Sequence, residues 1–218
     1  MHNELRKEFQ LERMILFSDA VFAIAITLLV IEIKIPDEHI DVSDNSLLRS
    51  LGHLIPKFIG FFISFMLIGI YWTVHHRMFG FVTSYNRKLL LLNLIFLFFV
   101  ALMPFSTGFY SEYAGPDLVR HQLKVPLTFY VLNFCCVGFI NFLMWRYITN
   151  PKNKVAEPQI DPLTAKLARL RAFIVPFIFL IMIPVAYLSD VRIAVLIPLL
   201  IPVVIFTLQK RIKKKFKQ

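Results

Sequence analysis

Charged residues are scarce in this chain of 218 residues: Asp, Glu, Lys and Arg make up 17% of it, against roughly 25% in an ordinary soluble domain. Glycine is scarce as well, and its seven copies are scattered. Apolar residues make up 57% of the sequence, and 23 residues are phenylalanine. Apolar runs near the ~20 residues that cross a bilayer as a helix recur throughout. We therefore exclude a soluble domain of useful size and predict a single transmembrane domain over residues 1–218.

Sequence patterns for catalysis and metal binding are also missing. No P-loop, HExxH, CxxC, GxSxG or GxGxxG pattern occurs. Ser18 and Asp19 are neighbours that face different ways on a helix, which makes a poor nucleophile and base pair. His75 and His76 are also neighbours and point about 100° apart, so they are poorly placed to chelate one metal. We therefore expect no enzyme activity, no cofactor and no resident metal.

Six apolar segments, separated by Pro, Gly and charged residues, are predicted to be transmembrane helices of an all-α protein. They cover residues 14–35, 50–76, 88–110, 124–148, 168–188 and 191–209. Only Ser189 and Asp190 separate the last two segments, which predicts a tight helical hairpin. The alternative of one long helix is disfavoured by the four prolines of this region, Pro176, Pro184, Pro198 and Pro202.

The distribution of basic residues predicts the orientation. If the chain crosses the membrane six times, 18 of its 24 Lys and Arg residues fall on the side of the N-terminus. The other six are Lys34, Arg49, Lys57, Arg120, Lys124 and Arg192. By the positive-inside rule, both termini are then cytoplasmic.

The net charge of +10 does not indicate nucleic acid binding. The basic residues lie at helix ends on one side of the membrane and in the tail at 210–218, where they meet anionic lipid headgroups. We therefore predict anionic lipid as a partner of these segments. On the opposite side, the linker at 36–45 carries four carboxylates, and it either concentrates cations at a pore mouth or is an ordinary solvated loop.

Asp19 is a charged residue inside the first predicted span. It lies about five residues from the start, roughly 7 to 8 Å deep, so it requires a partner. The predicted topology brings Arg13, Trp72, His75 and His76 to a similar depth. We interpret Asp19 as accepting a hydrogen bond from Trp72 or a histidine, with Arg13 balancing its charge. The group then forms a structural clamp between helices without a direct part in transport.

The span beyond Asp19 is apolar on every side, so its pattern does not identify a lipid-facing side. Two stripes at helical spacing occur on it, one small (Ala20, Ala23, Thr27) and one bulky (Ile24, Leu28, Ile31). Small residues allow close helix approach, whereas a bulky stripe usually faces lipid or a protein core.

The first span also resembles a known family. The RMILFSD segment fits the RxxxFSD pattern that opens the first helix of the lysosomal potassium channel family, transmembrane protein 175 type. Its matching residues are Arg13, Phe17, Ser18 and Asp19, joined by Trp72, His75 and His76 near the end of the second span. The number of spans and the orientation agree. A single FSD occurs without internal duplication, which is similar to the prokaryotic members with one repeat per chain.

The resemblance implies a homotetrameric, potassium-preferring cation channel in the cell membrane of a prokaryote, with the first helix lining the pore. Family constriction positions begin five residues after the motif aspartate and map onto Ile24, Thr27, Leu28 and Ile31. The family lacks a TVGYG filter, and so does this sequence. A ring of apolar side chains would gate by dewetting and favour potassium, which sheds water more readily than sodium. Arg13, Phe17, Ser18, Asp19, Trp72, His75 and His76 would then form the clamp at the cytoplasmic end.

Two other functions remain open. One is a secondary or proton-coupled cation transporter. Transporters often use discontinuous helices, and the prolines of the last two spans are consistent with such breaks. A non-conducting scaffold would instead bind a partner through its basic tail.

Overall fold

The structure is a computed structural model that describes residues 2–34, 43–84, 86–113, 122–156 and 160–215. All regular secondary structure in these ranges is helical. Six helical segments are long and apolar enough to cross a membrane: Phe9–Ile31, Ile55–Phe79, Arg87–Tyr113, Val125–Ile148, Pro162–Leu188 and Val191–Ile212. The prediction of an all-α protein with six spans is therefore confirmed. Most of the acidic linker at 36–45 lies outside the described residues.

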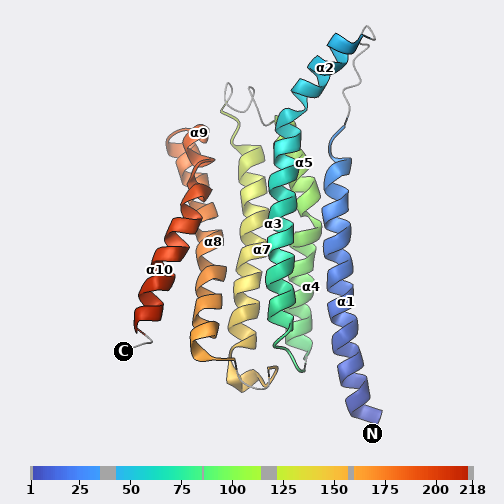
Figure 1. The fold of residues 1–218 in the computed structure, drawn as a ribbon, viewed down its shortest axis with the longest axis vertical. Coiled ribbons are helices and arrows are strands. Elements are labelled where there is room, and N and C mark those ends of the chain that lie inside the picture. The colour runs from blue at the N-terminus through green and yellow to red at the C-terminus, as the bar shows by residue number, and fades with distance from the viewer. Residues whose placement is uncertain (1, 35–42, 85, 114–121, 157–159, 216–218) are drawn as a thin grey trace.

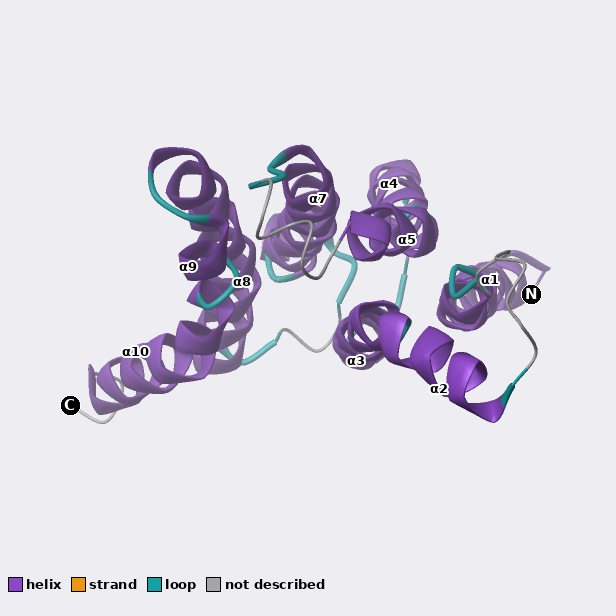
Figure 2. Ribbon diagram, turned by 90° about the horizontal axis from the view of Figure 1, so that it is seen from above, coloured by secondary structure: helices purple, strands orange, loops and turns teal. Residues whose placement is uncertain are grey.

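The long helices stand side by side and run alternately up and down, while α2 (Asp44–His53) leans away from them (Figure 1). Their bounds are α1 (His2–Ile31), α2 (Asp44–His53), α3 (Ile55–Phe79), α4 (Arg87–Ala101), α5 (Met103–Tyr113), α7 (Val125–Ile148), α8 (Pro162–Leu188), α9 (Val191–Ala194) and α10 (Ile201–Lys215), with 3-10 turns η1 (Pro151–Asn153) and η2 (Ile197–Leu200). Seen from above, they form a row with α1 at one end and α10 at the other (Figure 2). Both termini lie at the same end of the bundle, called here the N/C end, and α2 lies at the opposite end (Figure 1).

Several helix ends differ from the apolar segments. α1 begins at His2 and α8 at Pro162, well before the predicted 14 and 168, because polar residues continue each helix beyond its apolar part. The third span is interrupted at Leu102, two residues before Pro104, since proline lacks the N–H that a continuous helix uses.

The last two spans form the predicted hairpin. Ser189 and Asp190 separate α8 from α9, and the Asp190 carboxylate accepts a hydrogen bond from the Arg192 N–H at 2.7 Å. The sixth span is not one helix. It consists of α9, η2 and α10, with Pro198 and Pro202 near the changes of helix type.

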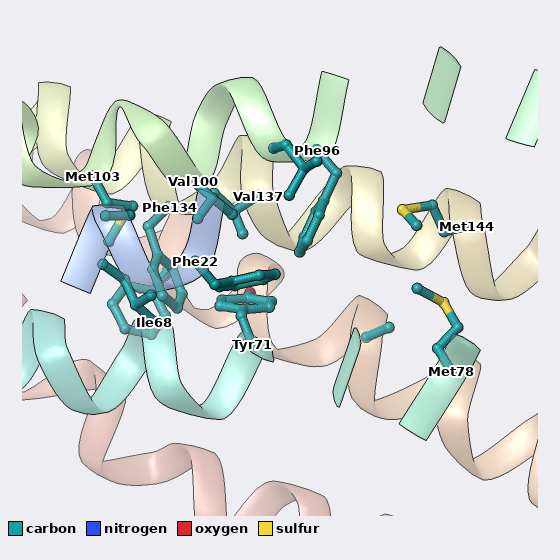
Figure 3. Packing of buried hydrophobic residues seen from close by; sticks show 14 of the residues in the cluster. Phe22, Ile68, Tyr71, Met78, Phe96, Val100, Met103, Phe134, Val137 and Met144 are labelled. Carbon is teal, nitrogen blue, oxygen red and sulfur yellow. The ribbon is translucent and has the colours of Figure 1, made fainter. Parts of the chain in front are cut away.

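Aromatic residues tie the middle of the bundle together (Figure 3). Phe22 of α1 packs 5.9 Å from Phe96 of α4, and Tyr71 of α3 packs edge-on to Phe134 of α7 at 5.5 Å between ring centroids. Gly138 permits close approach at this level, because a Cβ there would lie 2.7 Å from Pro176 Cβ and 2.8 Å from the Tyr71 hydroxyl. The core is therefore packed across α1, α3, α4, α7 and α8.

Buried hydroxyls link α3, α5 and α7 in the half of the bundle nearer α2. Thr107 donates to Ser64 at 2.8 Å, and Ser64 lies 3.1 Å from the Tyr130 hydroxyl. An ion pair between Lys57 and Glu112 at 2.7 Å joins α3 to α5 closer to that end. Interhelical hydrogen bonds of this kind hold apolar helices in a fixed register.

Candidate functional site

α1 has one face turned toward the rest of the bundle. Its buried residues recur every three or four positions and are Leu11, Met14, Ser18, Phe22, Ala25 and Leu29. This face packs against α3, α4 and α5. Such spacing places the buried residues along one side of the helix, so the opposite side is left for other contacts.

All four predicted constriction residues lie on the opposite, exposed face of α1. The exposed fractions are 57% for Ile24, 40% for Leu28 and 65% for Ile31. Thr27 is exposed between them, and its hydroxyl donates to backbone carbonyls of its own helix, at 3.1 Å to Ala23 and 2.9 Å to Ile24. Ala20 and Ala23 are exposed as well, so the small stripe and the bulky stripe share one uncovered face.

The motif aspartate bonds to the second span. The indole N–H of Trp72 donates to Asp19 Oδ1 at 2.9 Å, and His76 lies beside that indole at 5.8 Å between ring centroids. Asp19 is half-buried, while Trp72 and His76 are exposed. The contact therefore lies at the edge of the bundle and joins α1 to α3.

A second, fully buried set of hydrogen bonds lies behind this contact. His75 Nε2 lies 2.9 Å from Asn93 Oδ1, and Asn93 Nδ2 donates to Ser18 Oγ at 2.9 Å. Ser18 Oγ in turn donates to the Met14 carbonyl at 2.8 Å. Because an amide oxygen only accepts, His75 carries its proton on Nε2 in this arrangement. The chain of contacts joins α3, α4 and α1, and its three side chains are at most 1% exposed.

Asn93 was missed by the sequence reasoning. It is the single polar residue in the apolar run of α4, LLLLNLIFLFFVA, and it makes hydrogen bonds in two directions. Burying an amide at the centre of such a run costs free energy unless it has hydrogen-bond partners. The isolated asparagine was therefore the sequence feature that could have predicted a buried polar contact.

Arg13 and Phe17 do not join the other motif residues within the chain. Among the described residues, no ion pair connects Arg13 to Asp19, and the Arg13 guanidinium lies 5.7 Å from the Phe9 ring centroid. Six residues apart on one helix, Arg13 and Asp19 point about 120° apart, which explains the absent contact. Phe17 is 53% exposed on the same uncovered face as Ile24.

An apolar groove of about 310 Å³ lies on the exposed side of α3, next to the Trp72 contact. Its lining residues are Phe65, Met66, Gly69, Ile70, Trp72 and Thr73. A Cβ added to Gly69 would have nothing within 4 Å, so the groove is open beside this residue. Within the described ranges, no group of three or more His, Cys, Asp or Glu side chains gathers to hold a metal ion.

Comparison with known proteins places the motif in a family. A family model for the endosomal/lysosomal potassium channel TMEM175 matches residues 13–104, which include α1 through α4 from Arg13 onward. A potassium channel of Streptomyces collinus is 34% identical over 155 residues, covering 71% of this chain and 72% of that protein. An endosomal/lysosomal proton channel TMEM175 of Gallus gallus is 35% identical over 132 residues, which is 56% of this chain and 26% of that protein.

A solved structure agrees with the sequence match. The crystal structure of a lysosomal potassium-selective channel TMEM175 homolog from Chamaesiphon minutus aligns with a TM-score of 0.72 at 27% identity, covering 95% of this chain and 98% of that one. The resemblance inferred from RxxxFSD is thus confirmed along most of the chain. This multi-pass membrane protein belongs to the TMEM175 family, the family of the endosomal/lysosomal potassium channel.

Proposed function

We propose that the chain is one subunit of a homotetrameric, potassium-preferring cation channel, in which the exposed face of α1 lines the pore. The observation that carries this proposal is the position of Ile24, Thr27, Leu28 and Ile31 on one uncovered face. One chain encloses no path along this face, so a pore requires further copies. The name of the Streptomyces collinus relative, a potassium channel, supports the choice of ion.

In this channel, Ile24 forms the main constriction. Four isoleucine side chains around an axis make a dry neck that an ion passes only after losing water, and potassium loses its water at lower cost than sodium. Thr27 lies one turn farther along the helix and offers hydroxyl oxygens that replace some of the lost water ligands. Leu28 and Ile31 continue the apolar lining.

The hydrogen bonds behind the face fix the pore helix. Ser18 and Asp19 are each tied to a neighbouring helix, through Asn93 and Trp72. A narrow neck that selects by the cost of dehydration needs its helix held closely in place, so these contacts support the constriction without touching ions. Arg13 and Phe17 are exposed in the single chain, and we assign them to contacts with the next copy.

We place the second copy against the groove on α3. Its open part beside Gly69 lies on the same helix as Trp72, whose contact with Asp19 joins this face to α1. Small residues such as Ala20 and Ala23 allow a helix of another copy to approach closely there. Each copy then presents α1 to its neighbour's α3, a head-to-tail contact that forms a ring when the rotation between copies closes.

We place the N/C end in the cytoplasm of a prokaryotic cell, with the chain in its cell membrane. The positive-inside rule supports this orientation, because basic residues concentrate at that end. The transporter hypothesis has less support. Two of the described spans are interrupted near prolines. The span from α9 to α10 lies at the far end of the row from α1 (Figure 2), and the break between α4 and α5 at Leu102 lies nine residues beyond Asn93, away from the polar contacts of Ser18 and Asp19.

The proposal is tested by reconstituting the purified chain in liposomes and recording potassium and sodium currents in a planar bilayer. Ile24→Asn is expected to wet the neck, raise conductance and lower the potassium-to-sodium permeability ratio. The control is Ile181→Asn, which introduces the same polar group on an exposed position of α8, away from α1. Equal currents in wild type and Ile24→Asn would remove Ile24 from the pore, and flux that saturates at carrier rates would favour a transporter.

A further inference from the structure

The N/C end carries a concentration of positive charge at the edge of the bundle. The residues come from two helices: Arg169 and Arg171 from α8, and Lys210, Arg211 and Lys214 from α10. We call these five residues the basic cluster. Four of them are exposed and Arg169 is half-buried. No acidic residue occurs within α8 or α10 to neutralise them.

A hydrogen bond holds the two halves of the cluster together. Arg171 Nη2 donates to Gln209 Oε1 at 2.9 Å, and Gln209 immediately precedes Lys210. Arg169 is turned toward its own helix, where its Nε donates to the Ala165 carbonyl at 3.3 Å. A guanidinium has five N–H donors, so Arg171 keeps most of its donors for another acceptor.

The apolar part of α8 beyond the cluster is nearly as long as the hydrocarbon layer is thick. From Ala172 to Leu188, the remainder of α8 has 17 residues without a charge. At 1.5 Å per residue this segment is about 26 Å long, slightly less than the ~30 Å of the hydrocarbon layer. If Leu188 lies at one boundary of the hydrocarbon, Arg171 lies at the other, and Gln209 brings Lys210 to the same level.

Exposed apolar side chains lie next to the cluster on the membrane side. On α10 these are Phe206, 70% exposed, and Val203, 64% exposed. On α8 they are Phe173 and Phe177, whose rings stack 5.8 Å apart and are about half exposed. A molecule that meets both surfaces must carry an anionic head and apolar chains, which is the chemistry of an anionic phospholipid and not of free phosphate.

The position in the row separates the cluster from the proposed pore. α10 lies at the end opposite α1 and contacts α8 and the η2 turn (Figure 2). A ligand there does not reach the exposed face of α1 in the same chain. The cluster therefore has a role of its own, whatever passes along α1.

We propose that the basic cluster binds the headgroup phosphate of an anionic phospholipid, such as phosphatidylglycerol, in the membrane leaflet at the N/C end. Arg171 holds two phosphate oxygens through parallel N–H donors, and Lys210 adds charge from the neighbouring helix. The acyl chains lie along the exposed phenylalanines of α8 and α10. The bound lipid thus fixes α10, whose only side-chain hydrogen bond to α8 in the described part of the chain is the one from Arg171.

The test is lipid titration of the delipidated, full-length protein, read by native mass spectrometry. Phosphatidylglycerol is expected to bind in preference to phosphatidylcholine. The double variant Arg171→Gln/Lys210→Gln should lower phosphatidylglycerol affinity about tenfold or more, because each removed charge near the surface accounts for roughly a fivefold change. Arg171→Lys should retain part of the affinity, because lysine keeps the positive charge but cannot form the bidentate hydrogen bonds of a guanidinium.

The matched control is Lys152→Gln/Lys154→Gln in and after η1, at the same end of the bundle and with the same change of charge. An equal loss in this control would show diffuse attraction and overturn the site. Inorganic phosphate that displaces the lipid at constant ionic strength would point instead to a soluble ligand. If the first variant does not fold, Lys210→Gln/Lys214→Gln removes two exposed charges with Arg171 intact, and unchanged lipid affinity would again overturn the proposal.

Discussion

α1 and α10 lie at the two ends of the row and invite comparison (Figure 2). Each contributes to a segment long and apolar enough to cross the membrane, and each exposes large apolar side chains, Ile24 on α1 and Phe206 on α10. Their construction differs. α1 is one unbroken helix of 30 residues, whereas α10 follows a short helix and a 3-10 turn in a span that contains two prolines.

The two helices are also held differently. α1 is joined to its neighbours by buried side-chain hydrogen bonds of Ser18 and by the half-buried Asp19, and α10 has the exposed bond between Arg171 and Gln209. Exposure in one chain therefore does not distinguish a pore face from a lipid face. We propose that the polar contacts of Ser18 and Asp19 favour the pore assignment for α1, because a narrow pore requires a fixed helix and a lipid surface does not.

The largest expected effect comes from removing the buried link behind α1. Asn93→Leu leaves the His75 N–H without its acceptor in an apolar core, so the free energy of unfolding should fall by about 1–3 kcal/mol. Thermal unfolding in detergent, followed by tryptophan fluorescence or by loss of the oligomer, measures this change.

Asn141 supplies the matched control for that experiment. It is a buried asparagine of α7 whose Oδ1 has no hydrogen-bond partner among the described residues. Asn141→Leu should therefore leave stability unchanged or increase it, since it removes an unsatisfied polar atom. Equal destabilisation by the two variants would mean that Asn93 contributes volume and not hydrogen bonds.

A smaller effect is expected for the half-buried contact between Asp19 and Trp72. Asp19→Ala and Trp72→Phe should each destabilise the proposed tetramer by about 1 kcal/mol, the typical net contribution of one hydrogen bond. In a double-mutant cycle, the two changes together should cost less than their sum. Ion selectivity measured on the protein that stays assembled should hardly change, and a large shift in selectivity would place Asp19 in the ion path.

The number of spans was predictable because apolar length is a strong signal. The hairpin was predictable because only two polar residues, Ser189 and Asp190, separate two apolar segments. Helix ends were not predictable in the same way. Apolar length stops at the membrane boundary, while α1 and α8 continue as helices into polar sequence. The interruption at Leu102 depends on Pro104, a single proline that hydropathy does not register.

The candidate site was predictable only in part. RxxxFSD led to Ile24 through the family, whereas the apolar pattern alone assigned Ile24, Leu28 and Ile31 to lipid or core. The exposed face of α1 emerges only once the packing of the other helices is known. Asn93 was not predicted, because sequence motifs consist mainly of charged and catalytic residues. Its role as the link between His75 and Ser18 depends on contacts between three helices, which the sequence alone does not reveal.

The smallest effect is expected for a comparison of two threonines that have the same local structure and lie at opposite ends of the row of helices. Thr27 on α1 and Thr207 on α10 are both exposed, and each hydroxyl donates to a backbone carbonyl of its own helix. Replacement by valine keeps the shape and removes the oxygen. Thr27→Val should lower the potassium-to-sodium permeability ratio about two- to threefold. This is well below a tenfold change, which corresponds to ~1.4 kcal/mol. Thr207→Val should leave the ratio unaltered. Reversal potentials under bi-ionic conditions measure both, and if the two variants behave alike, the oxygen of Thr27 has no contact with the permeating ion.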